Sequence, residues 1–373
     1  MKTIISRDCV VYQDKLYFIT EGNAFPAVLD YDENIIKYLP ISSKVEIQPI
    51  DLALNMGSKI YFLYVSGKGI LEYDVETFSA NEIIIDCNQD SDDNYAFATI
   101  VKKQVYIFTK KMKKIVIFDT STKCVEEKPY PANMGEVSLM CGCIQGDYIW
   151  LFPETGNKIF SYCITSGQWK QYKFPIQYHN SLHAVCGKEY LYLLTWNGEV
   201  YEFRVNDLEN KLITSVGMDL DKGKSSRILY AEEKILILPG WGNDFYMFDL
   251  KQSELKKIAV WPDDVYFAPT RKKWFKFYGY CEDEKFFYFA NRTSNYYLRI
   301  EKNLEEFFWS KVSLPSGEDN IKNLLSNRQR ILMEYDFCLN DYIAYIEETL
   351  NYSALDSQIQ SAGNKIWDVV SGC

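Results

Sequence analysis

The sequence predicts an all-β fold in which seven four-stranded antiparallel blades close into a β-propeller, followed by a short helical segment. Three observations predict it. Aromatic residues make up 16% of the chain, and their wide, flat side chains favour pleated sheets. A strand pattern rich in aromatic residues recurs seven times at a nearly constant period. Short polar segments suited to tight antiparallel hairpins separate the strands within each copy.

The second strand of each copy gives the clearest repeat. Examples are Lys15-Leu-Tyr-Phe, Lys59-Ile-Tyr-Phe and Tyr190-Leu-Tyr-Leu. The first apolar residue of this strand stands at positions 16, 60, 105, 149, 191, 235 and 286, so the steps are 44, 45, 44, 42, 44 and 51 residues. Helical repeats of similar length need apolar residues at i, i+3 and i+4, whereas these segments alternate with period two. The pattern therefore excludes HEAT and tetratricopeptide arrays.

The other three strands follow in order around this one. A first strand ends in a turn such as Gln13-Asp14 or Gly57-Ser58, a third reads like Ile70-Leu-Glu-Tyr-Asp74, and a fourth like Trp169-Lys-Gln-Tyr-Lys-Phe174. One such blade cannot bury both its faces alone, and ring closure covers them. We expect the propeller to occupy residues 1–315, with Thr3-Ile-Ile5 adding a closing strand to the last blade.

Several copies resemble the kelch repeat, in which an apolar strand is followed by a Tyr-rich strand, a Tyr-Asp strand and a Trp. The residues that carry this resemblance are His183-Ala-Val-Cys-Gly187 with Tyr190-Leu-Tyr-Leu193, and Ile159-Phe-Ser-Tyr162 with Trp169. The paired glycines of the kelch second strand are absent from every copy. The resemblance implies the blade architecture and protein binding, and it implies no catalytic residues.

The segment 316–373 has a different periodicity and forms our second predicted unit. Leu339, Ile343, Ile346 and Leu350 fall on one face of a helix, and a second set runs from Leu355 to Val369. We therefore predict a helical pair. It either packs on the outside of the propeller or docks a partner through Tyr342, Tyr345 and Trp367.

Charge and termini limit the partners and the location. The net charge of −10 repels a phosphate backbone, so nucleic acid is not an expected partner. No apolar run approaches the roughly 20 residues of a membrane helix, and the first residues lack an export signal. We therefore expect a cytoplasmic protein without membrane contact, whose ten cysteines remain thiols.

Little in the sequence indicates catalysis. The only histidines are His179 and His183, too few for a metal-binding cluster, and a strand would hold them more than about 10 Å apart. Cys141-Gly-Cys143 points two thiols the same way along a strand, which fits a core face better than a redox turn. No nucleotide-binding glycine loop occurs. We predict no catalytic residue, no metal and no cofactor, although two carboxylates from different blades could escape detection.

The candidate binding residues lie where second strands meet third strands and where one blade joins the next. These loops share one face, around the mouth of the central channel. The candidates are Trp196, Trp241, Trp261, Trp274, Tyr178, His179, Arg271 and Arg292. Their aromatic rings either anchor a ligand or fold back as plugs over the blade ends.

These observations predict a non-enzymatic interaction module or scaffold that binds a partner protein through the mouth of the propeller. The alternative is a carbohydrate-binding or carbohydrate-processing propeller that uses the same aromatic rings and carboxylates.

Overall fold

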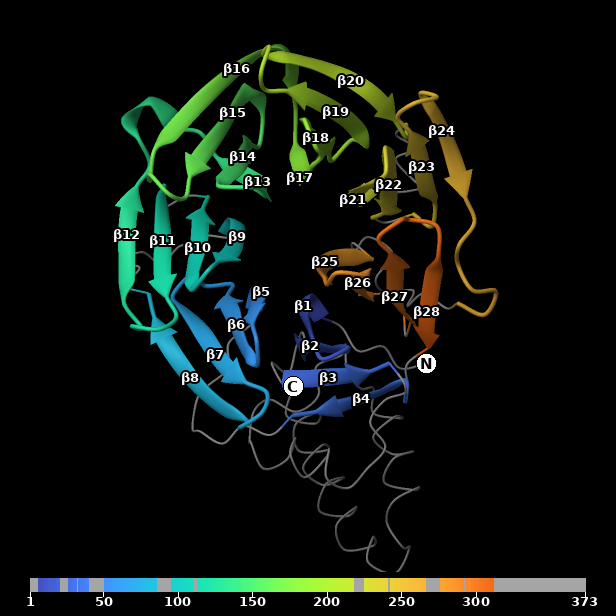
Figure 1. Cartoon of the computed structure of the whole chain (residues 1–373). Coiled ribbons are helices and arrows are strands. Elements are labelled where there is room, and N and C mark those ends of the chain that lie inside the picture. The colour runs from blue at the N-terminus through green and yellow to red at the C-terminus, as the bar shows by residue number, and fades with distance from the viewer. Residues whose placement is uncertain are drawn as a thin grey trace, which may run out of the picture.

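The computed structural model is a seven-bladed β-propeller, as the repeat predicts (Figure 1). It describes residues 6–20, 26–31, 33–39, 50–85, 95–110, 113–217, 225–240, 242–265, 276–291, 293–294 and 296–311. Each blade is an antiparallel sheet of four strands that are consecutive in the chain. The first strand of each blade lies innermost, beside the central channel, and the fourth lies at the rim (Figure 1).

The strands of the first four blades are β1 (Ser6–Tyr12), β2 (Lys15–Thr20), β3 (Pro26–Asp30), β4 (Ile35–Tyr38); β5 (Ile50–Met56), β6 (Lys59–Tyr64), β7 (Gly69–Asp74), β8 (Ser79–Ile84); β9 (Tyr95–Val101), β10 (Gln104–Thr109), β11 (Lys114–Asp119), β12 (Val125–Pro129); and β13 (Leu139–Gln145), β14 (Tyr148–Pro153), β15 (Gly156–Cys163), β16 (Trp169–Tyr178). The last three blades contain β17 (Ser181–Cys186), β18 (Tyr190–Thr195), β19 (Glu199–Arg204), β20 (Glu209–Ser215); β21 (Ser225–Ala231), β22 (Lys234–Pro239), β23 (Phe245–Asp249), β24 (Glu254–Ile258); and β25 (Phe277–Glu282), β26 (Phe286–Asn291), β27 (Tyr296–Glu301), β28 (Phe307–Lys311). A 3-10 turn, η1 (Ala132–Met134), precedes the fourth blade.

Tight turns join first to second and third to fourth strands on the face opposite the mouth. Gln13 and Asp14 have φ values of 49° and 56°, so this two-residue hairpin is a mirror-image turn whose twist matches its strands. Every turn from third to fourth strand contains one residue with φ between 52° and 67°: Asn34, Phe78, Lys123, Gly167, Leu208, Ser253 and Leu304. The blades thus share one turn geometry even where glycine is missing.

The aspartate that ends several third strands has a structural role. Oδ1 of Asp119 accepts hydrogen bonds from the backbone N–H groups of Ser121 (2.9 Å) and Thr122 (2.8 Å), and these bonds lower its pKa. Asp74 and Asp249 make equivalent bonds in their own blades. The aspartate that ends these strands is therefore explained by local turn closure.

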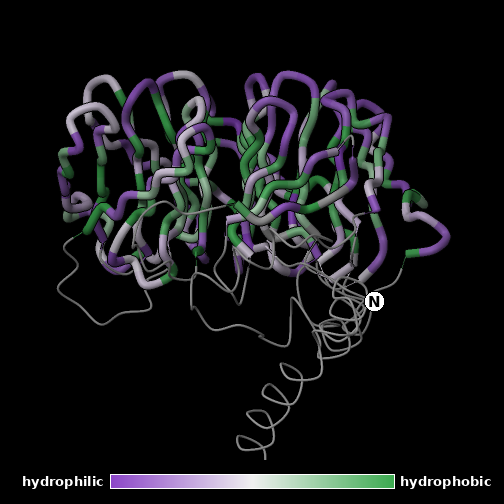
Figure 2. Tube along the Cα trace, turned by 90° about the horizontal axis from the view of Figure 1, so that it is seen from below, coloured by the Kyte–Doolittle hydropathy of each residue, from purple (hydrophilic) through white to green (hydrophobic). Residues whose placement is uncertain are grey.

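The core lies between adjacent blades, where the face of one sheet packs on the next. At the seam that closes the ring, Leu16 and Phe18 of the first blade pack on Tyr288 and Tyr297 of the last, and the Phe18 and Tyr297 ring centroids are 5.8 Å apart. Figure 2 shows the disc edge-on, with hydrophobic strands in green and a row of hydrophilic turns along its upper edge. In the described residues the seam is held by side chains rather than by strand exchange.

Two predictions fall on residues that the structure does not describe. The closing strand at residues 3–5 and the helical segment 316–373 both lie outside the described residues. In the part of the chain that is described, no helix has the length and apolar character needed to cross a membrane.

Candidate binding site in the central channel

Each innermost strand carries one extra residue near its start, on the mouth side of the channel. In the fifth blade, for example, Ser181 pairs with Thr195 and His183 with Leu194, so Leu182 is the extra residue. The same one-residue bulge occurs in all seven innermost strands. Bulges at the rim of a closed sheet re-aim the neighbouring side chains.

The bulges define a ring of seven residues, one from each blade, that we call the channel ring. Six of them occupy equivalent positions: Asp8, Leu52, Phe97, Cys141, His183 and Arg227. In the seventh blade the equivalent residue is Gly279, and the ring residue is the next one, Tyr280. All seven line a central cavity of about 840 Å³. A cavity of this size suits a small molecule or the tip of a protein loop.

The channel ring divides into two chemically different arcs. The apolar arc consists of Leu52, Phe97 and Cys141 from blades 2 to 4. The polar arc consists of His183, Arg227, Tyr280 and Asp8 from blades 5, 6, 7 and 1. Within the channel ring, the charged side chains and the imidazole therefore come from blades 5, 6 and 1.

The residues of the polar arc contact one another across blade boundaries. The Arg227 guanidinium lies 5.3 Å from the centroid of the Tyr280 ring, within the range of a cation–π contact. The His183 ring meets the same tyrosine edge-on, with centroids 5.5 Å apart. Nδ1 of His183 accepts the N–H of Ile228 at 3.3 Å. Burial, helped by the Arg227 charge, holds the pKa of His183 well below its usual value, so the ring is neutral.

Asp8 is the acidic member of the polar arc. It is buried, and its Oδ2 accepts the backbone N–H of Ala53 from the second blade at 2.8 Å. Burial raises the pKa of Asp8 to about 7, although the Ala53 hydrogen bond and the Arg227 charge oppose the rise. The carboxyl group thus changes charge near neutral pH, inside a cavity that also holds an arginine.

Further polar groups from blades 2, 3 and 5 line the cavity outside the channel ring. Asp51, which lines the cavity, pairs with Arg7 at 3.5 Å. Lys110 and Trp196 also line the cavity, each directly after the second strand of its blade. The mouth side of the cavity therefore presents cations, a carboxylate and an indole ring.

Among the predicted binding residues, the structure places Trp196 in the wall of this cavity, half-buried. Tyr178 is fully buried, packs on Phe203 and donates its hydroxyl hydrogen to the Lys158 carbonyl at 2.9 Å, so it stabilises the blade. His179, the next residue, is exposed.

Trp261 adopts the plug arrangement that we considered for the mouth tryptophans. Its ring packs on Trp309 with centroids 4.5 Å apart and on Phe277, and its Nε1–H donates to the Asn243 carbonyl at 2.6 Å. Trp241, Trp274, Arg271 and Arg292 lie outside the described residues. Trp196 is thus the predicted residue that the structure brings to the cavity.

The two thiols of Cys141-Gly-Cys143 both lie in the packed core between the fourth and fifth blades, as predicted. No group of three or more potential metal ligands of the His, Cys, Asp or Glu type is found among the residues that the structure describes. The polar arc was not predicted from the sequence. The feature that could have located it is a constant spacing: each channel-ring residue of blades 1 to 6 stands eight residues before the first apolar residue of the second strand.

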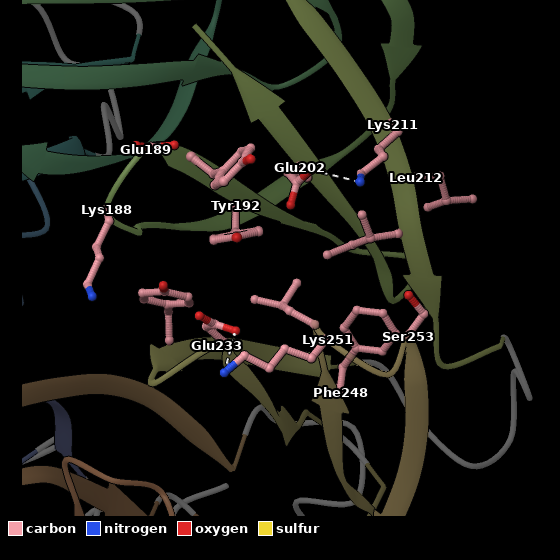
Figure 3. A pocket seen from close by; sticks show the side chains of 14 residues that line it. Lys188, Glu189, Tyr192, Glu202, Lys211, Leu212, Glu233, Phe248, Lys251 and Ser253 are labelled. Carbon is pink, nitrogen blue, oxygen red and sulfur yellow. Dashed lines mark ion pairs between the residues drawn. The ribbon is translucent and has the colours of Figure 1, made fainter.

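A second hollow lies on the opposite face, between the fifth and sixth blades (Figure 3). This groove of about 570 Å³ is lined by Tyr190, Tyr192, Tyr230 and Phe248. The Tyr192 and Tyr230 rings stack at 5.3 Å. Two ion pairs border the groove, Glu202 with Lys211 and Glu233 with Lys251, both at 3.0 Å. Four of its charged side chains are therefore already paired within the protein.

Comparison with known proteins identifies the fold and no family. No protein-family model and no curated protein matches the sequence. A catalytically inactive variant of virginiamycin B lyase from Staphylococcus aureus, solved with quinupristin, is 12% identical with a TM-score of 0.57, over 78% of this chain and 95% of that one.

Two further solved structures are similar at the same level. PorZ, a surface component of the type-IX secretion system of Porphyromonas gingivalis, is 13% identical with a TM-score of 0.53, over 84% of this chain and 39% of that one. The designed protein Ika8 is 7% identical with a TM-score of 0.50, over 84% of this chain and all of that one, 100%. Such identities show a shared propeller fold alone.

Proposed function

We propose that the protein is a non-enzymatic interaction module that binds a partner protein through the mouth of its channel, with a loop of the partner reaching the polar arc. The observation that supports this is the split channel ring. At the same structural position, blades 2 to 4 use Leu52, Phe97 and Cys141, so packing does not require an ionisable residue there. Keeping the buried Asp8 and the half-buried Arg227 beside a cavity is costly, and ligand recognition explains that cost.

The mouth side of the cavity fits a loop with both polar and apolar side chains. Arg227 and Lys110 supply charge-assisted hydrogen-bond donors, Asp8 supplies an acceptor or a donor according to pH, and Trp196 supplies a flat apolar surface. Arginine and tryptophan are the residue types that most often dominate binding energy in protein interfaces.

The test uses the full-length protein and three variants. Arg227→Met and Lys110→Glu alter the cavity, and Lys170→Glu alters an exposed lysine on β16 at the rim. Partners captured from the native lysate are identified by mass spectrometry and then titrated with each purified variant. We expect the Kd to weaken tenfold or more for Arg227→Met and to remain unchanged for Lys170→Glu. A partner bound equally well by all the variants would contradict binding in the channel, provided that each variant melts near the wild-type temperature.

Carbohydrate binding is the second candidate, and the groove of Figure 3 is the observation that favours it. Sugars stack on aromatic rings and hydrogen-bond to carboxylates, and Tyr230 with Glu233 offers both. A glycan array separates the two candidates. Carbohydrate binding in the groove predicts a signal that Tyr230→Ala removes and Arg227→Met leaves unchanged, whereas a blank array with folded protein counts against it.

A further inference from the structure

Two cysteines from adjacent blades meet in the wall of the central cavity. Cys143 of β13 and Cys186 of β17 bring their Sγ atoms to 2.6 Å from each other, and both residues line the cavity. A covalent S–S bond measures about 2.04 Å, so the two sulfurs are within about 0.6 Å of bonding distance. The second such contact among the described residues, between Cys9 and Cys281, is wider at 3.8 Å.

Neighbouring contacts hold the two strands together at this point. Nε2 of Gln145 on β13 donates to the carbonyls of Gly187 (2.8 Å) and Lys188 (3.0 Å), which directly follow β17. A Cβ atom on Gly142 would stand only 2.7 Å from the Trp150 carbonyl oxygen, so the chain beside Cys143 is closely packed. The two thiols are therefore held near each other by the fold rather than by chance rotamers.

The two thiols differ in accessibility. Cys186 is half-buried, whereas Cys143 is only 8% exposed. Burial raises the pKa of Cys143 well above its usual value, so this thiol is a poor first nucleophile near neutral pH. A reagent that enters the cavity therefore meets Cys186 first.

We propose that Cys143 and Cys186 form a dithiol site that exchanges with low-molecular-weight disulfides and yields a reversible disulfide between the fourth and fifth blades. In the first step the Cys186 thiolate attacks one sulfur of the small disulfide, which forms a mixed disulfide and releases one small thiol. Cys143 then loses its proton and attacks the Cys186 sulfur, and the second small thiol leaves. Two protein thiols are oxidised by two electrons, and one small disulfide is reduced to two thiols.

The experiment uses full-length protein incubated with oxidised glutathione, followed by acid quenching, alkylation of free thiols and peptide mapping by mass spectrometry. We expect a cross-linked peptide pair joining Cys143 to Cys186, two hydrogens lighter than the reduced pair, which disappears on reduction with dithiothreitol. Failure to detect this pair when the exposed Cys124 carries glutathione would overturn the proposal.

Single substitutions test the two-step order. Cys143→Ser removes the second thiol, so glutathione should remain on Cys186 as a stable mixed disulfide. Cys186→Ser should leave Cys143 largely unmodified over the same time, because its thiol is buried. Cys9→Ser is the matched control in the other cysteine contact and should not change the yield of the Cys143–Cys186 pair. Equal labelling of both cysteines by glutathione in wild-type protein, without a cross-link, would contradict the geometry on which the site rests. If the Cys143→Ser variant fails to fold, the peptide map of the wild type still decides.

Discussion

Blades 2 to 4 place Leu52, Phe97 and Cys141 at the channel ring, whereas blades 5, 6 and 1 place His183, Arg227 and Asp8 at the same position. Blade 7 adds Tyr280 one residue later. Both arcs lie after the same bulge and line the same cavity. The fold therefore accepts a small thiol, an aliphatic chain or an aromatic ring there. The comparison indicates that the polar arc is not needed for folding, and that its energetic cost needs another explanation.

Substitutions at the seam where the last blade closes on the first should lower the stability of the propeller the most. A Cβ atom on Gly279 would collide with the backbone of Arg7 and Asp8, the strand against which the last blade closes. We expect Gly279→Ala to lower the free energy of unfolding by about 4 kcal/mol or to prevent folding. Urea denaturation, or soluble yield where no folded protein forms, measures the effect.

Gly142→Ala adds the same methyl group beside Cys141 of the apolar arc. Its Cβ would stand 2.7 Å from the Trp150 carbonyl oxygen and 2.9 Å from Cγ of Phe97, whose side chain can move. We expect a loss of about 2 kcal/mol. If Gly142→Ala proves the more damaging change, the seam is not the weak point of the ring.

Ionisation of Asp8 should produce the next largest effect. Because the pKa of Asp8 in the fold is about 7 and that of an unfolded aspartate is about 3.9, the folded protein holds a proton that the unfolded chain releases. This residue therefore lowers stability as the pH rises from about 4 to about 7, and its effect is constant above that. Asp8→Asn cannot ionise but still accepts the Ala53 N–H, so it should gain up to about 4 kcal/mol over wild type by pH 8.

Denaturation of both proteins at several pH values from 5 to 8 checks this. The informative quantity is the difference in free energy of unfolding between wild type and Asp8→Asn. His183, whose pKa is lowered, reduces the stability of both proteins as the pH falls below about 6.5, and this contribution cancels in the difference. A difference that does not change with pH would mean that Asp8 is ionised throughout, and the polar arc would then carry a fixed negative charge.

The blades could be predicted from sequence because the second strands are rich in aromatic and other apolar residues and recur at a nearly constant step. Second strands begin at Lys15, Lys59, Gln104, Tyr148, Tyr190, Lys234 and Phe286, within one residue of the predicted starts. The channel ring was harder to predict, since the bulge that aims it adds one residue without any preferred residue type. Cys143 and Cys186 are 43 residues apart, close to one repeat, which places them in neighbouring blades. This contact was not predicted, because the two cysteines meet one repeat apart rather than close in sequence.

Alanine substitutions of Trp196 and Trp261 test whether each tryptophan contributes to binding in the cavity or to packing in the core. Trp261 packs on Phe245, Phe277 and Trp309, so Trp261→Ala should lower the free energy of unfolding by about 2 kcal/mol. Trp196 lines the cavity, so we expect Trp196→Ala to cost about 1 kcal/mol and to weaken partner binding. Thermal melts of both variants measure the difference, and a larger loss for Trp196→Ala would assign it to the core instead.

The smallest effect is expected in the apolar arc. Cys141 is 5% exposed and packs between the fourth and fifth blades, and valine has a similar volume. We expect Cys141→Val to change the free energy of unfolding by less than about 1 kcal/mol and to leave the Kd of the partner unchanged. Arg227→Met occupies the equivalent position in the polar arc and should weaken the same Kd tenfold or more. Because the two substitutions lie in one ring around one cavity, a nonspecific change of cavity shape would affect both. An equal loss of affinity in the two variants would therefore show that the arcs do not differ in function, and an effect confined to Arg227→Met would assign recognition to the polar arc.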